Sequence, residues 1–193
     1  MFGGPATSHL GLNVGCGPHY APGWINTDLV ATDEVRPDVV TSADAPFPFP
    51  PASFKRAYVG HVLEHVAWNE LPHWLDDLAL VLSPGAPAMF VGPDADAAIE
   101  CYRTGTVSRE QVDGIIEALQ PYHGGDGRWD GDRHQWNCNG PRLAIAVELA
   151  GWQDIEIIAV NPGEDLPDLP GWPVVSHAPL QCAVSARAPE SSR

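Results

Sequence analysis

Hydrophobic residues recur along this chain in two kinds of pattern. Short apolar runs bounded by glycine, proline or polar residues predict buried strands. Segments with apolar residues at every third or fourth position predict amphipathic helices. The predicted strands cover residues 10–14, 24–29, 38–41, 57–60, 88–92, 152–160 and 181–186. The predicted helical segments cover residues 62–82, 95–103, 108–119 and 141–150.

Prolines and the order of the elements refine this picture. Pro72 is expected to split segment 62–82 into two helices, because proline lacks the amide hydrogen of an interior turn. Four prolines within residues 45–53 exclude a helix or central strand, so we expect an ordered surface loop. Strands alternate with helices over the first two thirds, whereas only a loop separates the last two strands. This order predicts a Rossmann-like, doubly wound α/β sheet of seven mostly parallel strands with an antiparallel C-terminal strand.

Length and composition favour one globular domain. The chain has 193 residues, of which 44% are hydrophobic and 18% charged, and these values are typical of a folded protein with a single core. We place the core at about residues 10–187, with variable loops at 121–139 and 161–173. No apolar run approaches the roughly 18 residues of a membrane span, and no signal peptide is visible, so we expect a cytoplasmic protein.

The net charge of −15 limits the choice of partners. Only 10 lysines and arginines are present, and they are scattered, so we expect binding to neither nucleic acid nor an anionic membrane. The four cysteines lie far apart and form no CxxC pair, which argues against a zinc knuckle and a disulfide framework.

Candidate ligand-binding residues follow the first three predicted strands. Gly15 and Gly17 come directly after the first strand and allow a ligand to approach the backbone closely. Asp28 ends the second strand, where a carboxylate can accept from both ribose hydroxyls, and Asp44 can accept from the amino group of adenine. Each residue alone is also compatible with an ordinary turn or loop cap. A dinucleotide fingerprint is excluded because Tyr20 stands at the third glycine position of GxGxxG.

Several motifs occur together and in order over about residues 10–160. They are LNVGCG at 12–17, GWINTD at 23–28, DVV at 38–40, Asp44, FPFP at 47–50, SF at 53–54, Tyr58, HVLEH at 61–65, VLSPG at 81–85 and AGW at 150–152. By these motifs the chain resembles the class I S-adenosylmethionine-dependent methyltransferases, and it is similar to a small predicted subfamily with an HVLEH motif. It departs from the family pattern at Ala86, where a second glycine is usual, and the stretch from Gly17 to Asp28 is too short for a full first helix.

The resemblance implies S-adenosylmethionine as the cofactor. It implies that Gly15 and Gly17 approach the methionine and ribose parts, and that Asp28 holds the ribose. Asp44 and a neighbouring backbone amide are expected to read the adenine, while Gly60 and His61 flank the sulfonium. The full set of implied cofactor-binding residues is Asn13, Gly15, Cys16, Gly17, Asp28, Ala43, Asp44, Ala45, Gly60 and His61.

Methyl transfer to a hydroxyl group also needs a base that removes the hydroxyl proton. The candidate catalytic residues are Asp94, after the fifth strand, and His123 and His134, in the loop 121–139. For each of the two histidines, a structural role in the loop is favoured over the role of base.

Aromatic and acidic loops give one indication of the acceptor. Trp129, Trp136 and Tyr122 are suited either to stack on a sugar or to hold their loop against the core. Together with the absence of a basic patch, they favour O-methylation of a saccharide or small molecule. The alternatives are a protein or nucleic-acid acceptor, and a methyltransferase-like binding protein without activity.

The HVLEH motif also fits HxxEH, a pattern of zinc peptidases. On a helix, His61 and His65 would share one face and bind zinc, with Glu64 as general base. The segment follows a strand directly and the sequence identifies no third ligand, so we assign no metal site. The alternative is that Glu64 and His65 support the start of the helix and the cofactor loop.

Overall fold

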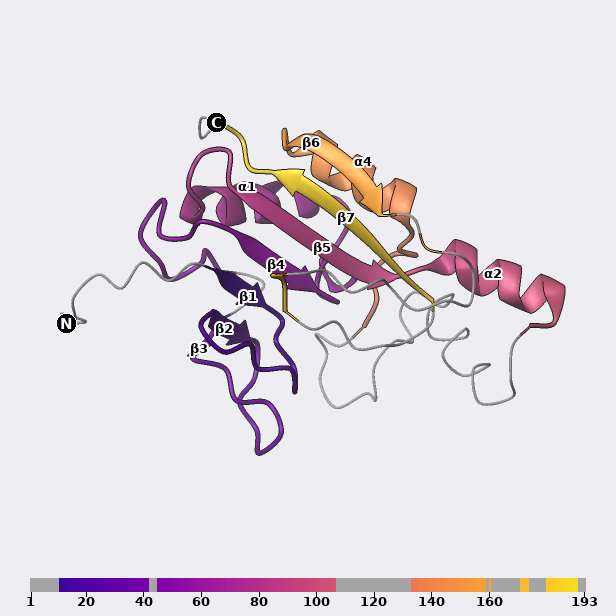
Figure 1. Ribbon diagram of the computed structural model, residues 1–193, viewed down its shortest axis with the longest axis horizontal. Coiled ribbons are helices and arrows are strands. Elements are labelled where there is room, and N and C mark those ends of the chain that lie inside the picture. The colour runs from indigo at the N-terminus through magenta and orange to yellow at the C-terminus, as the bar shows by residue number, and fades with distance from the viewer. Residues whose placement is uncertain are drawn as a thin grey trace.

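The computed structural model (Figure 1) describes residues 11–41, 45–106, 133–158, 160, 171–173 and 180–190. Its strands are β1 (Leu12–Val14), β2 (Ile25–Asp28), β3 (Val39–Val40), β4 (Ala57–Gly60), β5 (Pro87–Pro93), β6 (Gln153–Ile158) and β7 (Gln181–Arg187). Its helices are the 3₁₀ turn η1 (Leu63–His65), α1 (Leu71–Val81), α2 (Ala95–Thr104) and α4 (Gly140–Leu149). The strands form one sheet in the order β3-β2-β1-β4-β5-β7-β6.

Strand direction agrees with the prediction from the sequence. β1 is parallel to β2 and β4, and the pairs β2–β3 and β4–β5 are parallel as well. β7 is antiparallel to both β5 and β6. The predicted Rossmann-like, mostly parallel sheet of seven strands with an antiparallel C-terminal strand is therefore confirmed. Because β2, β1 and β4 are parallel neighbours, the loops after them meet at one edge of the sheet (Figure 1).

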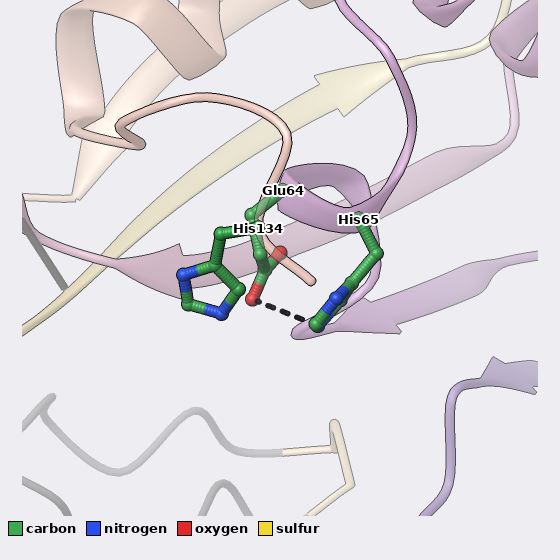
Figure 2. A group of neighbouring side chains, drawn as sticks. All are labelled: Glu64, His65 and His134. Atoms are coloured by element: carbon green, nitrogen blue, oxygen red, sulfur yellow. Dashed lines mark ion pairs between the residues drawn. The ribbon is translucent and has the colours of Figure 1, made fainter. Parts of the chain in front are cut away.

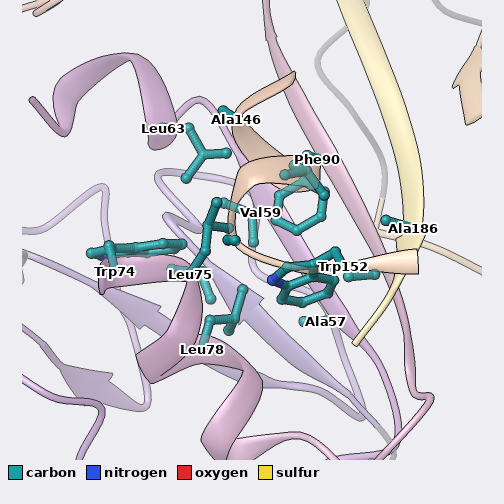
Figure 3. Packing of buried hydrophobic residues seen from close by; sticks show 14 of the residues in the cluster. Ala57, Val59, Leu63, Trp74, Leu75, Leu78, Phe90, Ala146, Trp152 and Ala186 are labelled. Carbon is teal, nitrogen blue, oxygen red and sulfur yellow. The ribbon is translucent and has the colours of Figure 1, made fainter. Parts of the chain in front are cut away.

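Alternate side chains of the central strands face opposite sides of the sheet, as the period of two requires. Val59 of β4 and Phe90 of β5 pack in the larger core with Leu75 of α1, as Figure 3 shows. Tyr58 and Met89, one position earlier in the same strands, belong to a separate cluster. Helices α1 and α4 contact each other, and α4 also contacts β6 and β7. These two helices therefore cover the same face of the sheet.

The connection between β1 and β2 contains no helix, as its length predicts. The buried side chain of Asn26 organises it. Asn26 Oδ1 accepts from the Ala21 amide at 2.8 Å and from Asn13 Nδ2 at 2.9 Å. Asn26 Nδ2 lies 3.1 Å from the carbonyl oxygens of Ala21 and Trp24 and 3.0 Å from Asp38 Oδ2. A buried amide with this many partners fixes the path of a chain segment that lacks regular hydrogen bonds of its own.

The prediction of two helices in segment 62–82 is wrong in its first half. That half is the single turn η1 followed by non-helical residues, and α1 begins only at Leu71. Pro72 lies in the first turn of α1, where the helix needs no amide donor, so it starts a helix instead of dividing one. The irregular loop at 45–53 is confirmed.

Parts of the sequence prediction fall where the structure gives no description. The predicted helix 108–119, most of the loop 121–139 and most of the loop 161–173 lie outside the described residues. Among the helices that are described, none has the length and apolar character needed to cross a membrane.

Candidate functional site

The loop after β1 packs tightly against the end of β4. Gly15 has a φ of +70°, and a Cβ placed there would lie 2.3 Å from Val62 Cγ2 and 3.0 Å from the Gly60 carbonyl oxygen. Its amide donates to the Thr27 carbonyl oxygen at 2.9 Å, which holds the loop to β2 as well. Glycine is required at this position both for its conformation and for the close approach of the two segments.

Gly17 and Asp28 lie at the same edge of the sheet, Gly17 in the loop after β1 and Asp28 at the end of β2. The Gly17 amide donates to Asp28 Oδ2 at 2.8 Å, and the Val30 amide lies 3.4 Å from Asp28 Oδ1. An ionised carboxylate has about four acceptor positions, so Asp28 retains capacity for the hydroxyls of a ligand. Gly17 has a φ of +50°, and a Cβ there would meet nothing within 4 Å. The backbone beside Asp28 is therefore open on that side.

The side chains of Asn13 and Cys16 are used inside the protein. Asn13 is 1% exposed and donates to Asn26, while Cys16 is 3% exposed. Burial, with the nearby charges of Asp28 and Asp38, raises the pKa of the Cys16 thiol to about 11. The thiol therefore stays protonated at neutral pH. Both side chains lie in the protein interior, and the predicted contact of these two residues with the cofactor stays a prediction.

Gly60 and His61 lie at the end of β4, beside the glycine loop. His61 has a φ of +53°, which is unusual for a residue with a side chain. Its amide donates to the Val91 carbonyl oxygen at 2.9 Å, so pairing with β5 holds this conformation. The His61 side chain is 40% exposed, and its Nδ1 lies 3.2 Å from Glu64 Oε1.

Glu64, His65 and His134 form a cluster of ligating groups immediately beside His61. One carboxylate oxygen and one nitrogen from each imidazole lie within 4.8 Å of one another. The centroids of the His65 and His134 rings are 4.9 Å apart at an interplanar angle of 75°. Figure 2 shows the Glu64 side chain between the two rings.

Two hydrogen bonds position His134 in this cluster. The Gln135 amide donates to the Glu64 carbonyl oxygen at 2.6 Å, and Trp136 Nε1 donates to the Leu63 carbonyl oxygen at 3.0 Å. Trp136 is 4% exposed and packs edge-to-face on Trp68. Of the two roles that the sequence leaves open for Trp136, the structure therefore supports holding the segment against the core. Tyr122 and Trp129 lie outside the described residues.

Glu64 is a buried carboxylate surrounded by imidazoles. Its burial by itself raises the pKa, but the interaction with His61 and the nearby charges of His65 and His134 together lower the Glu64 pKa below its usual range. The three imidazoles together thus outweigh the effect of burial on the Glu64 pKa.

Comparison with known proteins gives a clear structural answer and no answer from sequence. No family model matches the chain, and no curated protein matches its sequence. A methyltransferase from Archaeoglobus fulgidus, described as dependent on S-adenosylmethionine, is 14% identical, with a TM-score of 0.57 over 93% of this chain and 86% of its own. The fold is that of the class I S-adenosylmethionine-dependent methyltransferases.

Two further methyltransferase structures have the same fold. One from Methanosarcina mazei is 14% identical and has a TM-score of 0.58, covering 94% of this chain and 92% of its own. One from Aquifex aeolicus is 10% identical and has a TM-score of 0.54, covering 94% of this chain and 82% of its own. At these identities the likeness establishes the methyltransferase fold, and it leaves activity and acceptor to other arguments.

Within the methyltransferase fold, the predicted cofactor residues divide into three groups, and the buried Asn13 and Cys16 form the first. Gly15, Gly17, Asp28, Gly60 and His61 converge on the edge formed by the ends of β1, β2 and β4. The predicted adenine contacts are only partly described, because Ala43 and Asp44 lie outside the described residues and Ala45 is simply exposed. The adenine contacts therefore remain predictions.

The structure describes two of the three candidate bases, and their surroundings differ. Asp94 is the N-cap of α2: its Oδ1 accepts from the amides of Asp96 and Ala97 at 3.0 and 3.1 Å. Burial chiefly raises its pKa, but capping gives Asp94 a structural explanation, as expected for an aspartate directly before a helix. His123 lies outside the described residues, and His134 belongs to the cluster with Glu64.

Sequence reasoning missed the cluster as a unit. It paired His61 with His65 on a helical face, but the 3₁₀ turn begins only at Leu63 and His61 precedes it with a left-handed backbone. The HxxEH helix of a zinc peptidase is therefore not formed. The third member, His134, lies about seventy positions further along the chain, and no local spacing connects it to Glu64.

Proposed function

We propose that this protein binds S-adenosylmethionine at the ends of β1, β2 and β4 and transfers its methyl group to a hydroxyl of a saccharide or small molecule. The observation that carries this proposal is the junction of Gly17 and Asp28, in which the amide and the carboxylate lie 2.8 Å apart with open space beside Gly17. This arrangement fits a ribose, because Asp28 has acceptor positions left for two hydroxyls.

The residues of this edge fit the cofactor in other respects. Gly15 brings the loop after β1 against Gly60, the residue that directly precedes His61. When bound, S-adenosylmethionine supplies a methyl group that passes to the acceptor oxygen as the carbon–sulfur bond breaks and the hydroxyl proton is lost. The protein has to hold the donor and the acceptor in line and exclude water, and the negative field of the chain favours a cationic cofactor.

Charge is the main support for the acceptor class. A net charge of −15 disfavours a polyanionic acceptor such as nucleic acid. There are two alternatives. In the first, the enzyme methylates a protein, and in the second, the protein binds the cofactor but methylates nothing.

Calorimetric titration with S-adenosylmethionine and S-adenosylhomocysteine tests the cofactor site. Wild type is expected to bind one equivalent of either ligand, and Asp28→Ala to bind at least about tenfold more weakly, because hydrogen bonds to a charged group contribute about 1.5–3 kcal/mol each. Asp33→Ala is the matched control, because Asp33 is an exposed acidic residue in the loop after β2. Its affinity should equal that of wild type.

The result that contradicts the cofactor assignment is a folded wild type that binds neither ligand, or equal affinities in Asp28→Ala and Asp33→Ala. Transfer of labelled methyl groups to a panel of sugars and small alcohols then tests the acceptor. Cofactor binding without transfer to any member, or to a protein extract, would favour the inactive alternative.

A further inference from the structure

The cluster of Glu64, His65 and His134 has the composition of a metal site. We propose that these three side chains bind a divalent transition metal ion of the zinc class. Ion binding follows from the cluster itself, and only the role of the ion in catalysis rests on the proposed methyl transfer.

The donor set and its spacing support an ion. Zinc and its neighbours prefer imidazole nitrogen together with carboxylate oxygen, at bond lengths of about 2.0–2.2 Å. Tetrahedral ligand atoms at such bond lengths lie roughly 3.4 Å apart, and the three ligand atoms here lie within 4.8 Å of one another. A bound ion would draw the three ligand atoms together to this separation.

The buried carboxylate supplies an independent argument. The Glu64 side chain is 1% exposed, and among the described residues neither of its oxygens has a hydrogen-bond partner of good geometry. The imidazole nitrogens nearest to Glu64 Oε1 in this part of the chain are His61 Nδ1 at 3.2 Å and His65 Nε2 at 4.0 Å. Burying a carboxylate without hydrogen-bond partners is costly. A divalent cation between Glu64 and the imidazoles removes that cost.

The frame of the site is built before any ion arrives. Glu64 and His65 belong to η1, and His134 is fixed against η1 by the hydrogen bonds that Gln135 and Trp136 make to its backbone. A site whose ligands are held by the main chain loses little conformational entropy on binding an ion. Three protein ligands also leave a fourth position open, as in catalytic zinc sites.

The position of the cluster suggests what the open position is for. His61 touches Glu64 and also lies at the end of β4, beside the proposed cofactor site. A hydroxyl bound to the ion would have a lowered pKa and would lose its proton to solvent as the methyl group arrives. The ion would thus activate the acceptor.

Metal titration of the full chain, freed of metal by a chelator, tests the site. Wild type is expected to bind one Co²⁺ per chain with visible absorption bands, and one Zn²⁺ in competition with it. Glu64→Gln and His134→Ala are each expected to lower the affinity by at least about 100-fold. His73→Ala is the matched control, because His73 is 79% exposed on α1 and pairs only with Asp77 among the described residues.

Three results would overturn the proposal. The first is a folded wild type that takes up no Co²⁺ or Zn²⁺, and the second is an unchanged affinity in His134→Ala. The third is a strong near-ultraviolet thiolate band that disappears in Cys138→Ser, because it would assign the ion to the buried cysteines Cys138 and Cys182.

Two controls distinguish a loss of metal binding from a loss of folding and from a failure of the proposed function. Thermal unfolding shows whether Glu64→Gln and His134→Ala remain folded, and conserved binding of S-adenosylhomocysteine shows that their cofactor edge is intact. A wild type that binds metal but no S-adenosylhomocysteine contradicts the proposed function alone. A wild type that binds S-adenosylhomocysteine but no metal contradicts the metal site alone.

Discussion

Gly15 and Gly17 share a left-handed backbone but differ in their surroundings. A Cβ at Gly15 would collide with Val62 and Gly60, whereas a Cβ at Gly17 would enter open space. Gly15→Ala should therefore lower the free energy of unfolding by about 2–4 kcal/mol, from a left-handed penalty of about 1–2 kcal/mol together with overpacking. Gly17→Ala should cost only about 1 kcal/mol, measured for both variants by urea unfolding.

Gly17→Ala should nevertheless weaken ligand binding. The methyl group of Gly17→Ala would occupy the space assigned to the cofactor, so its affinity for S-adenosylhomocysteine should fall at least about tenfold although the fold is stable. Gly23→Ala is the matched control, because Gly23 also has a positive φ and open space around it but lies in the turn before β2. Equal affinities in Gly17→Ala and Gly23→Ala would place the ligand elsewhere.

Among the connecting segments, the one between β1 and β2 depends on a single side chain. Asn26→Ala removes the hydrogen bonds to Asn13, Ala21, Trp24 and Asp38 and leaves buried partners unsatisfied. Because each such bond contributes about 1 kcal/mol and each orphaned group costs more, the free energy of unfolding should fall by about 3–5 kcal/mol in urea denaturation.

A second asparagine serves as the control for this substitution. The Asn69 side chain is exposed and donates only to Glu70 Oε1 among the described hydrogen bonds. Asn69→Ala should change the free energy of unfolding by less than about 0.5 kcal/mol. Similar losses in the two variants would show that Asn26 does not organise the connection.

The whole molecule carries 25 acidic and 10 basic residues. Repulsion among like charges destabilises the folded state, and dissolved salt weakens this repulsion. Raising sodium chloride from about 20 mM to about 0.5 M at pH 7 should therefore raise Tm, by about 2–4 °C for each kcal/mol gained. Near pH 4.6, the isoelectric point expected from the sequence, the gain should vanish. A Tm that falls with salt at pH 7 would show that favourable ion pairs outweigh the repulsion.

Much of the molecule was predictable from the sequence, because the relevant signals are local. Apolar runs placed all seven strands, and their alternation with helices predicted a mostly parallel sheet with one antiparallel strand. In a parallel sheet, the ends of successive strands meet at one edge. The positions of Gly15, Gly17 and Asp28 in the sequence were therefore sufficient to predict that they meet in space.

Other features depended on contacts that no local pattern encodes. Apolar spacing predicted helix from residue 62, but pairing of His61 with β5 and the docking of residues 135–136 on η1 leave only a single turn before α1. The same docking joins His134 to Glu64. The sequence by itself determined the order and direction of the strands and the meeting of Gly15, Gly17 and Asp28 at one edge of the sheet, since periodicity and strand order suffice for both. Only the tertiary structure decided the ligand cluster, because it needs two segments far apart in the chain to be held together by hydrogen bonds.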